Sequence, residues 1–511
     1  MKKLGLLWFV CLVSITLAFG QEVCNNGIDD DGDGFIDCYD GDCANNAACA
    51  GSFLGHNIAC QAIPPPSTFT MKLKWQSPNK TTNHLNRASV GDLDRDGVPE
   101  VVVTEIENKW IYILNGVTGL VKKSLQVGFS IQRDPLIGNI DNSNCAWIFV
   151  TDGNSAVYAY DCNLNLKWKN TKLSADPKLM GLADFDGDGK SELYFRDEIL
   201  AAESGVRIVK GTNSSNAAGG PVAVDILDGA GNPSATGDNK LELISGCNIF
   251  TVNLGARTSG SGSLTLAKSA AGYFYWEKNG NTSLTSIADY NADGFLDVIS
   301  TGSTIGQSKN ATAFFWDVKN NTVNTYVDLD NTVVTLGGCS GSPPSSGQFY
   351  QNGWQNGLGR INIADIDGDG KLNATYISGR YMYALDDTWK PLVTWGAVPI
   401  NGVHKIQVNE ETSGYTGCTV YDFNGDGAAE VVYRDEQFLY IINGNGTINT
   451  QQQCIARTQF EYPIVSDIDG DGQTELCVTC GFDDVAAWSN FCSTPYSENS
   501  CVRVFSSASV P

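Results

Sequence analysis

Residues 364–370 read Ala-Asp-Ile-Asp-Gly-Asp-Gly, with an acidic side chain at every second position and a glycine at the end. Oxygen-bearing side chains at alternate positions of a short loop can curl around one cation, and Ca²⁺ prefers six to eight oxygen ligands at about 2.3–2.6 Å. The glycine permits the backbone turn that brings these oxygens together. This stretch therefore predicts a calcium-binding loop. For a single copy, a turn that binds no ion is the alternative.

The pattern occurs seven times, as Asp or Asn at positions 1, 3 and 5, Gly at position 6, and an acid, once Asn, at position 9. The predicted ligands are Asp29, Asp31, Asp33, Asp37, Asp92, Asp94, Asp96, Glu100, Asp184, Asp186, Asp188, Glu192, Asp289, Asn291, Asp293, Asp297, Asp365, Asp367, Asp369, Asn373, Asp422, Asn424, Asp426, Glu430, Asp467, Asp469, Asp471 and Glu475. The carbonyl group at position 7 can also face the ion. Because Mg²⁺ rarely sits in an all-protein cage, we predict that the cofactor is Ca²⁺, with up to about seven ions.

The charge of the chain agrees with bound cations. The 511 residues include 57 acidic and 33 basic side chains, which gives a formal net charge of −24. Without ions the clustered carboxylates would repel one another, so we predict that stability depends on calcium. The acidity argues against nucleic acid and anionic membranes as partners, since both require a basic surface.

The amino-terminal residues have the features of a secretory signal peptide. Lys2 and Lys3 precede an apolar run over residues 4–19, and small residues lead to a predicted cleavage site after Gly20. No later segment approaches the ~18 continuous apolar residues of a membrane span, so we predict no membrane insertion. The 16 cysteines fit an oxidising compartment. We expect a protein that is secreted or displayed at the cell surface.

A short cysteine-rich segment follows the signal peptide of residues 1–20. Residues 21–62 contain the first acidic loop and five cysteines whose pairing cannot be deduced, namely Cys24, Cys38, Cys43, Cys49 and Cys60. A segment this short buries little core, so disulfides and an ion would have to hold it together. We predict a small calcium-binding module over 21–62, a proline-containing linker over 63–70 and a larger domain over 71–511.

Strand-like runs surround the other acidic loops. In one unit they cover residues 87–91, 101–105, 110–114 and 120–126, and in another 361–364, 374–379, 381–386 and 391–395. Two weaker units begin near residues 136 and 222, and their loops, at Asn139 and Asp225, have lost the pattern and are predicted to bind no ion. A base period near 45 residues matches a four-stranded propeller blade.

We therefore predict an all-β propeller of eight four-stranded blades, with seven blades as the alternative. The last unit has a third strand near residues 501–506 and then ends, so residues 71–75 are predicted to supply its fourth strand and close the ring. Residues 73–75 read Leu-Lys-Trp, as do residues 166–168 of an earlier fourth strand.

Several cysteines of the larger domain are candidates for disulfides. Cys145 and Cys162 flank a predicted hairpin at matching distances from its turn, which favours a bond across the two strands. The cysteines near the last blade are expected to staple that blade around an insertion, with buried thiols as the alternative; they are Cys477, Cys480, Cys492 and Cys501.

The loops and their spacing resemble FG-GAP (VCBS-type) repeats, the propeller repeats of integrin α-subunits and of many secreted bacterial proteins. Residues 364–370 match closely, and the resemblance covers about residues 71–511. The segment from Cys24 to Cys43 resembles a cysteine-flanked acidic metal-binding motif found at the start of such bacterial proteins. The resemblance implies a binding or adhesion scaffold whose calcium loops stiffen the blades while ligands meet the opposite face.

No catalytic residue is predicted. His56, His84 and His404 stand in no triad or metal motif, and most carboxylates are accounted for as calcium ligands. We therefore favour a non-enzymatic adhesion or ligand-binding scaffold whose partner is an extracellular protein or glycan. The alternative is a polysaccharide lyase or lectin on the same propeller, as some lyases use one, although basic clusters are few. Aromatic residues that could stack on sugars or pack in the core are Trp354, Tyr381, Tyr383, Trp389 and Trp395.

Overall fold

The computed structural model describes residues 70–507, apart from gaps of one to four residues and the longer gaps 211–219, 276–283, 305–310, 327–359, 409–416, 455–461 and 481–500. Within these described ranges every regular element is a β-strand. No helix in this part of the chain is long and apolar enough to cross a membrane. The predicted signal peptide and the cysteine-rich module over 21–62 lie outside the described residues.

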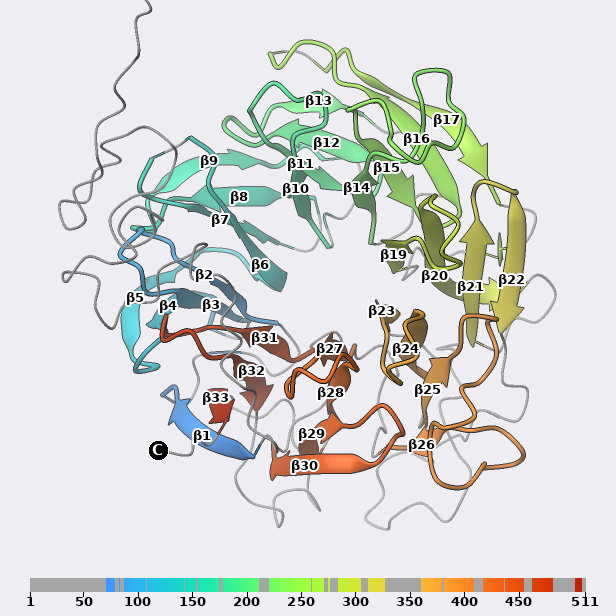
Figure 1. Ribbon diagram of the computed structural model, residues 1–511. Helices are drawn as coiled ribbons and strands as arrows, with labels where there is room; N and C mark the ends of the chain where they lie inside the picture. The colour runs from blue at the N-terminus through green and yellow to red at the C-terminus, as the bar shows by residue number, and fades with distance from the viewer. Residues whose placement is uncertain are drawn as a thin grey trace, which may run out of the picture. The chain divides into compact units, whose positions relative to one another are not determined.

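The strands form eight antiparallel sheets arranged around a ring, which confirms the prediction of eight blades (Figure 1). Blades one to four contain β2 (Ser89–Gly91), β3 (Glu100–Glu105), β4 (Trp110–Asn115) and β5 (Val121–Gln126); β6 (Gln132–Gly138), β7 (Trp147–Thr151), β8 (Val157–Tyr160) and β9 (Leu166–Asn170); β10 (Gly181–Ala183), β11 (Glu192–Phe195), β12 (Glu198–Ala201) and β13 (Arg207–Val209); and β14 (Val222–Val224), β15 (Glu242–Ser245), β16 (Asn248–Asn253) and β17 (Ser263–Ser269).

Blades five to eight complete the ring and include one extra short strand. They contain β19 (Thr285–Ala288), β20 (Asp297–Thr304), β21 (Ala311–Asp317) and β22 (Thr322–Tyr326), with β18 (Phe274–Tyr275) also paired to β20; β23 (Asn362–Ala364), β24 (Asn373–Ser378), β25 (Tyr381–Leu385) and β26 (Ile406–Gln407); β27 (Thr419–Tyr421), β28 (Glu430–Arg434), β29 (Phe438–Ile442) and β30 (Ile448–Gln453); and β31 (Ile464–Ser466), β32 (Glu475–Cys480), β33 (Cys501–Ser507) and β1 (Met71–Gln76).

The ring closes as the sequence predicts. Strand β1 pairs antiparallel with β33, so that Met71 lies opposite Ser507 and Leu73 opposite Phe505. The first described strand is therefore the outermost strand of the eighth blade. Pairing the two ends of the domain in one sheet removes the open edge that an unclosed ring would expose.

The repeated Leu-Lys-Trp sequence places one tryptophan in each of two outer strands. Trp75 of β1 donates from Nε1 to the carbonyl of Gly116 at 2.6 Å, and Trp168 of β9 donates to Ala202 at 2.8 Å. Each bond reaches the next blade in the ring, in the turn between its third and fourth strands. The same residue pattern thus fastens blade eight to blade one and blade two to blade three.

The hydrophobic core lies between neighbouring blades. Each second strand is packed on both faces, and all six residues of β3 are buried, whereas β5 at the outer edge alternates between exposed and half-buried positions. One cluster joins Ile111 of blade one to Ile148 of blade two, and another joins Phe149 to Leu193 of blade three. Burial on both faces accounts for the nearly continuous apolar runs of these strands.

The predicted fourth strand of blade six, over residues 391–395, is wrong. The strand is β26 at Ile406–Gln407, and Pro391 forms only an isolated bridge with Leu385. Trp389, with a φ of 61°, and Gly396, with a φ of 79°, turn the chain away from the sheet edge. Trp395 is fully buried there, because its ring fills the space beside β25 and its Nε1 donates to the Met382 carbonyl at 3.2 Å.

The disulfide predictions are confirmed in one case and wrong in the other. Cys145 and Cys162 are bonded. Cys480 pairs with Cys454, which follows β30, so this bond joins blades seven and eight instead of stapling the last blade to itself. Cys477 and Cys501 are buried free cysteines, and burial raises the pKa of each thiol to about 12. Cys492 lies outside the described residues.

The antiparallel order of the strands gives the ring two distinct faces. In each blade, the link between the first and second strands and the turn between the third and fourth lie on one side, which we call the loop face. The turn between the second and third strands and the link to the next blade lie on the other side, the connection face. The six acidic loops among the described residues belong to the loop face.

Candidate metal centres

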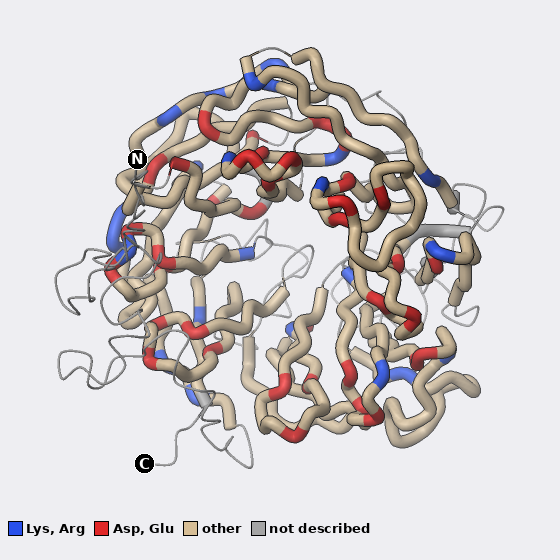
Figure 2. Tube along the Cα trace, turned by 45° about the horizontal axis from the view of Figure 1, so that its top comes forward, with Lys and Arg blue, Asp and Glu red and all other residues tan. Residues whose placement is uncertain are grey.

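Six of the seven acidic loops lie in the described part of the chain. Each links the first and second strands of a blade, in blades one, three, five, six, seven and eight. Asp and Glu accordingly recur in the loops of successive blades around the ring (Figure 2). The first predicted loop, with Asp29, Asp31, Asp33 and Asp37, lies outside the described residues.

The aspartate at position 1 organises the backbone of each loop. In blade eight, Asp467 Oδ1 accepts from the Gly470 N–H at 2.7 Å and Oδ2 accepts from the Gly472 N–H at 2.9 Å. Gly472 has a φ of 81°, a conformation that L side chains rarely adopt. Glycine at position 6 is therefore required by the turn, and the turn keeps the acidic side chains together.

The side chain at position 9 is buried and anchors the loop to the second strand. Glu475 is fully buried, and its Oε2 accepts from the Ile468 N–H at 2.9 Å. In blade six the amide oxygen of Asn373 accepts from Ile366 in the same way, at 2.8 Å. An acceptor is all that this bond needs, which explains why one copy of the pattern can carry Asn.

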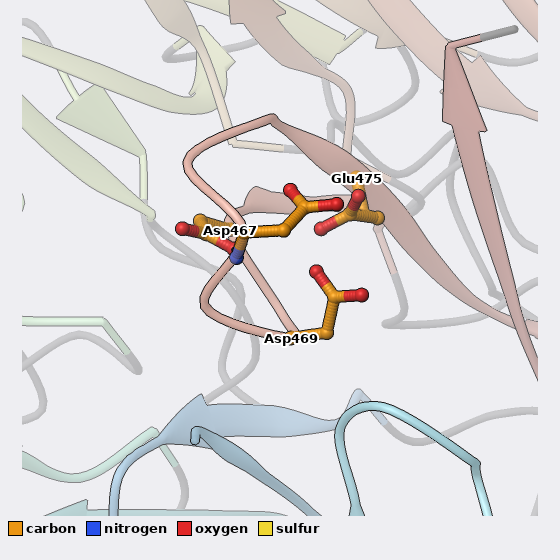
Figure 3. Close-up of side chains that lie close together, drawn as sticks. Asp467, Asp469 and Glu475 are labelled. Carbon is orange, nitrogen blue, oxygen red and sulfur yellow. The ribbon is translucent and has the colours of Figure 1, made fainter. Parts of the chain in front are cut away.

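Four loops bring at least three acidic side chains close enough to hold one metal ion, with one oxygen from each within 4.8 Å of the others. Figure 3 shows three of the side chains in blade eight pointing toward one another. The four groups are Asp467, Asp469, Asp471 and Glu475; Asp92, Asp94 and Asp96; Asp184, Asp186 and Glu192; and Asp365, Asp367 and Asp369.

The two loops that carry Asn at position 3 do not gather three acidic side chains in this way. In blade five, Asn291 Oδ1 accepts from the Asp293 N–H at 3.1 Å, and in blade seven Asn424 Oδ1 accepts from the Asp426 N–H at 2.9 Å. The amide oxygens remain possible ligands, but these loops concentrate less negative charge. Their predicted ligands, which include Asp289, Asp297, Asp422 and Glu430, stay predictions.

Unsatisfied oxygens show that the residues present fit a cation. Oδ1 of Asp94, of Asp367 and of Asp469 is buried and has no hydrogen-bond partner among the described residues. All three occupy position 3 of their loops. Asp297 Oδ1, at position 9 in blade five, is also buried and has no hydrogen-bond partner among the described residues. A buried carboxylate oxygen without a donor costs about 1–3 kcal/mol or more, and a divalent cation would remove that cost.

Burial also disfavours the charged form of three carboxylates at position 9. It raises the pKa of Glu192, Asp297 and Glu475 to about 7 in each case, and nearby carboxylates contribute in the same direction. A bound cation has the opposite effect, because it stabilises the ionised form. Ion binding and carboxylate ionisation are thus coupled at these positions.

Basic side chains from outer strands enter two of the loops, which the sequence analysis did not foresee. In blade one, Lys122 Nζ lies 2.6 Å from Glu100 Oε1 and 2.9 Å from Asp94 Oδ2. In blade eight, Lys74 Nζ lies 2.9 Å from Glu475 Oε1 and also pairs with Asp469. The available signal was a lysine in the fourth strand of the same blade as the loop.

Two other loops also have basic neighbours. Arg257 of blade four pairs with Glu192 and with Glu203, the latter at 2.7 Å. Lys319 lies 3.3 Å from Asp293 in blade five. No Lys or Arg of the described residues forms an ion pair with the predicted ligands in loops 365–373 and 422–430, since Lys371 pairs with Asp387 instead.

Blades two and four lack the pattern, as the sequence indicates, but differ from each other. In blade two, the Cys145–Cys162 disulfide links the first loop to the turn between the third and fourth strands. In blade four, Asp225 accepts from the Asp238 and Asn239 N–H groups, and Glu242 accepts from Ile226 at 3.0 Å. The longer loop keeps the hydrogen bonds of the acidic loops. That it binds no ion stays a prediction.

Comparison with known proteins supports the fold only. No family model matches the chain, and no curated protein matches it. Among solved structures, the V. cholerae biofilm matrix protein Bap1 is 16% identical, with 86% of this chain and 92% of that chain covered and a TM-score of 0.55. At this identity the likeness shows a shared propeller fold and nothing more.

Two further solved structures overlap less well. A quinohemoprotein alcohol dehydrogenase from Pseudomonas putida HK5 is 10% identical over 86% of this chain and 77% of that chain, with a TM-score of 0.47. A europium-containing methanol dehydrogenase is 12% identical over 85% of this chain and 93% of that chain, with a TM-score of 0.45. Neither likeness bears on the function of this chain.

Proposed function

We propose that this chain is a secreted, calcium-stabilised propeller of the FG-GAP (VCBS) type that acts as an extracellular adhesion or ligand-binding scaffold. The observation that carries the proposal is the set of buried, unsatisfied oxygens at position 3, on Asp94, Asp367 and Asp469. Three equivalent loops have the same unmet need, and a divalent cation meets it with the oxygen ligands that Ca²⁺ prefers.

The ions would act as structural braces in this proposal. Each loop joins the innermost strand of a blade to the buried second strand, so an ion held there fixes the strand pair at the loop face. The connection face, which carries the links between blades, is then free to meet a ligand. Two disulfides in the propeller support an oxidising, extracellular setting.

The alternative is a carbohydrate-active protein, a lectin or polysaccharide lyase, on the same propeller. The aromatic residues that could have formed a sugar platform in blade six do not favour it, because Tyr383, Trp389 and Trp395 are buried in the core. Trp354 lies outside the described residues. His404, the one histidine that the described residues include, contacts a backbone carbonyl of Gly396 at 3.3 Å.

A binding screen in calcium separates the two proposals. The purified full chain is tested on a glycan array and on extracellular matrix proteins, beside an assay for release of unsaturated or reducing sugar ends. Saturable binding to a matrix protein without turnover supports the scaffold and contradicts the carbohydrate-active alternative. Turnover of any polysaccharide would contradict the scaffold and support the enzyme.

A further inference from the structure

One residue from each blade lies at the same place where the chain enters the innermost strand. The strand register defines the position: each first strand ends opposite position 9 of its loop, as Gly91 lies opposite Glu100, and the residue four places earlier is the equivalent one. The eight residues are Arg87, Asp134, Leu179, Gly220, Leu284, Arg360, Gly417 and Tyr462. Because the first strands lie nearest the centre of the ring (Figure 1), the register places these residues around that centre at the connection face, and we call this set of eight residues the mouth.

Contacts between successive members support this arrangement. The Arg87 N–H and Nε each donate to Asp134 at 2.6 Å, and the Arg87 guanidinium carbon lies 4.3 Å from the centre of the Tyr462 ring. A Cβ on Gly417 would lie 3.1 Å from Tyr462. On the other side of the mouth, Gly220 bridges to Leu284. These contacts join neighbouring members of the set, although the residues come from points spread over the whole domain.

The two halves of this mouth differ in character. One half is apolar, with Leu179, Gly220 and Leu284, and the other carries two arginines, a tyrosine and a single carboxylate. Asp134 is committed to Arg87 by an ion pair and two hydrogen bonds. Among these eight described residues, two basic side chains therefore stand against one acidic side chain, although the whole chain has a net charge of −24.

Arg360 is the source of that excess charge. It has no hydrogen bond or ion pair with any residue that the structure describes. Burial lowers the pKa of its guanidinium, and the charge of Arg87 contributes in the same direction. A partly buried guanidinium beside a second one is costly, and a protein selected only for stability would gain by replacing it.

We propose that the arginine half of this mouth, formed by Arg360 with Arg87 and Tyr462, binds a carboxylate group of the ligand. A planar guanidinium pairs with a carboxylate through two parallel hydrogen bonds, and the second arginine supplies further charge. Gly417 lies between Arg360 and Tyr462 in the register and packs against the Tyr462 side chain. The inference rests on the proposed function in one respect, that the propeller has an extracellular ligand.

The test compares Arg360→Met with Lys169→Met, an exposed basic residue on the outer strand β9 of blade two, in the full chain saturated with calcium. Binding is followed by calorimetry with glucuronate, with acetyl-aspartate amide and with glucose. Wild type and Lys169→Met should bind a carboxylate probe and not glucose, and Arg360→Met should bind the probe at least about tenfold more weakly. Binding of glucuronate but not of acetyl-aspartate amide would identify an acidic sugar as the source of the carboxylate. Binding of both probes would show that the site accepts a carboxylate irrespective of its source.

Thermal unfolding gives a second readout that distinguishes a ligand site from a structural role. Arg360→Met should leave the Tm unchanged or raise it, because it removes a partly buried charge that no described residue pairs with, whereas Arg87→Met should lower the Tm by leaving Asp134 without its partner. A lower Tm for Arg360→Met, or equal binding of the probes by wild type and Arg360→Met, would overturn the proposal. The calcium dependence of stability is measured separately and would survive that outcome.

Discussion

The loops of blades six and eight carry nearly the same sequence pattern but meet different surroundings. In blade eight, Lys74 from the strand that closes the ring reaches into the acidic group and pairs with Asp469 and Glu475. In blade six, no basic side chain of the described residues pairs with Asp365, Asp367 or Asp369. The loop of blade eight therefore already holds the Lys74 ammonium group, which a metal ion must displace. The loop of blade six depends on a cation from solution. Loops with nearly the same sequence pattern in one chain need not bind calcium with equal affinity.

Calcium removal should give the largest effect and should separate the two kinds of loop. Loss of a ligand at a hundredfold excess over its Kd costs about 2.7 kcal/mol per site, so chelation should lower the Tm of the whole propeller. Amide exchange should accelerate first in loops 365–373 and 422–430, and later in loops 92–100 and 467–475. Uniform exchange across all four loops would remove the distinction between them.

Blade two extends the comparison, because a disulfide takes the place of an ion there. Cys145 and Cys162 are 17 residues apart, and replacing both with alanine should cost about 3 kcal/mol in the free energy of unfolding. Denaturant unfolding of the double variant measures this cost, with and without chelator. The calcium-dependent part of the stability should equal that of wild type, and a change in that part would mean that blade two also depends on an ion.

Removing the Lys74 ammonium group should make the loop of blade eight bind calcium as the loop of blade six does. Lys74→Met should tighten calcium binding at loop 467–475 by about tenfold, since the ion no longer competes with an ammonium group, and should destabilise the calcium-free protein. Calcium titration followed by calorimetry measures the change. Lys72→Met is the matched control, because Lys72 is exposed on the same strand. Equal effects of both substitutions would show that Lys74 acts only through net charge.

The pH dependence of stability should reverse sign with calcium. Without ions, the folded pKa of Glu192, Asp297 and Glu475 is about 7, above the ordinary range of about 4 for the unfolded chain. Folding then takes up protons, so the calcium-free protein should be more stable near pH 5 than near pH 7.5. With calcium the carboxylates stay ionised, and stability should fall on acidification through the release of ions. Tm values at both pH values test this; the same slope in both conditions would contradict it.

The smallest effect concerns the turn at position 6. Gly370 has a φ of 82°, and no atom lies within 4 Å of the place that a Cβ would take, so Gly370→Ala should cost about 1 kcal/mol through backbone strain alone. Gly128 also has open space around it but no positive φ, so Gly128→Ala should have little effect. Equal costs at both glycines would mean that the turn does not require glycine.

The sequence predicted features that are encoded locally and failed on those that depend on contacts between distant segments. Loop spacing, apolar second strands and the Leu-Lys-Trp repeat were sufficient for the eight blades and the closing strand. The partner of Cys480 was missed because Cys454 belongs to the neighbouring blade. The prediction of a strand over residues 391–395 was wrong because the apolar side chains there cover the blade edge while the backbone does not pair with it.

The same reasoning explains which parts of the candidate sites were visible. The acidic ligands follow one another at fixed offsets, so the sequence displays them directly. Lys74 lies 401 residues before Glu475, and nothing local marks their contact. Arg87 and Arg360 likewise become neighbours only through the closure of the ring. Residues that modify or extend a site from another strand are therefore the ones that a repeat pattern cannot reveal.

Elemental analysis of the purified, folded full chain after dialysis against micromolar calcium tests the central claim most directly. The account predicts several calcium ions per chain, up to about seven, and a cooperative loss of structure when a chelator removes them. A folded chain that contains no calcium under these conditions, with a Tm that chelator leaves unchanged, would contradict it.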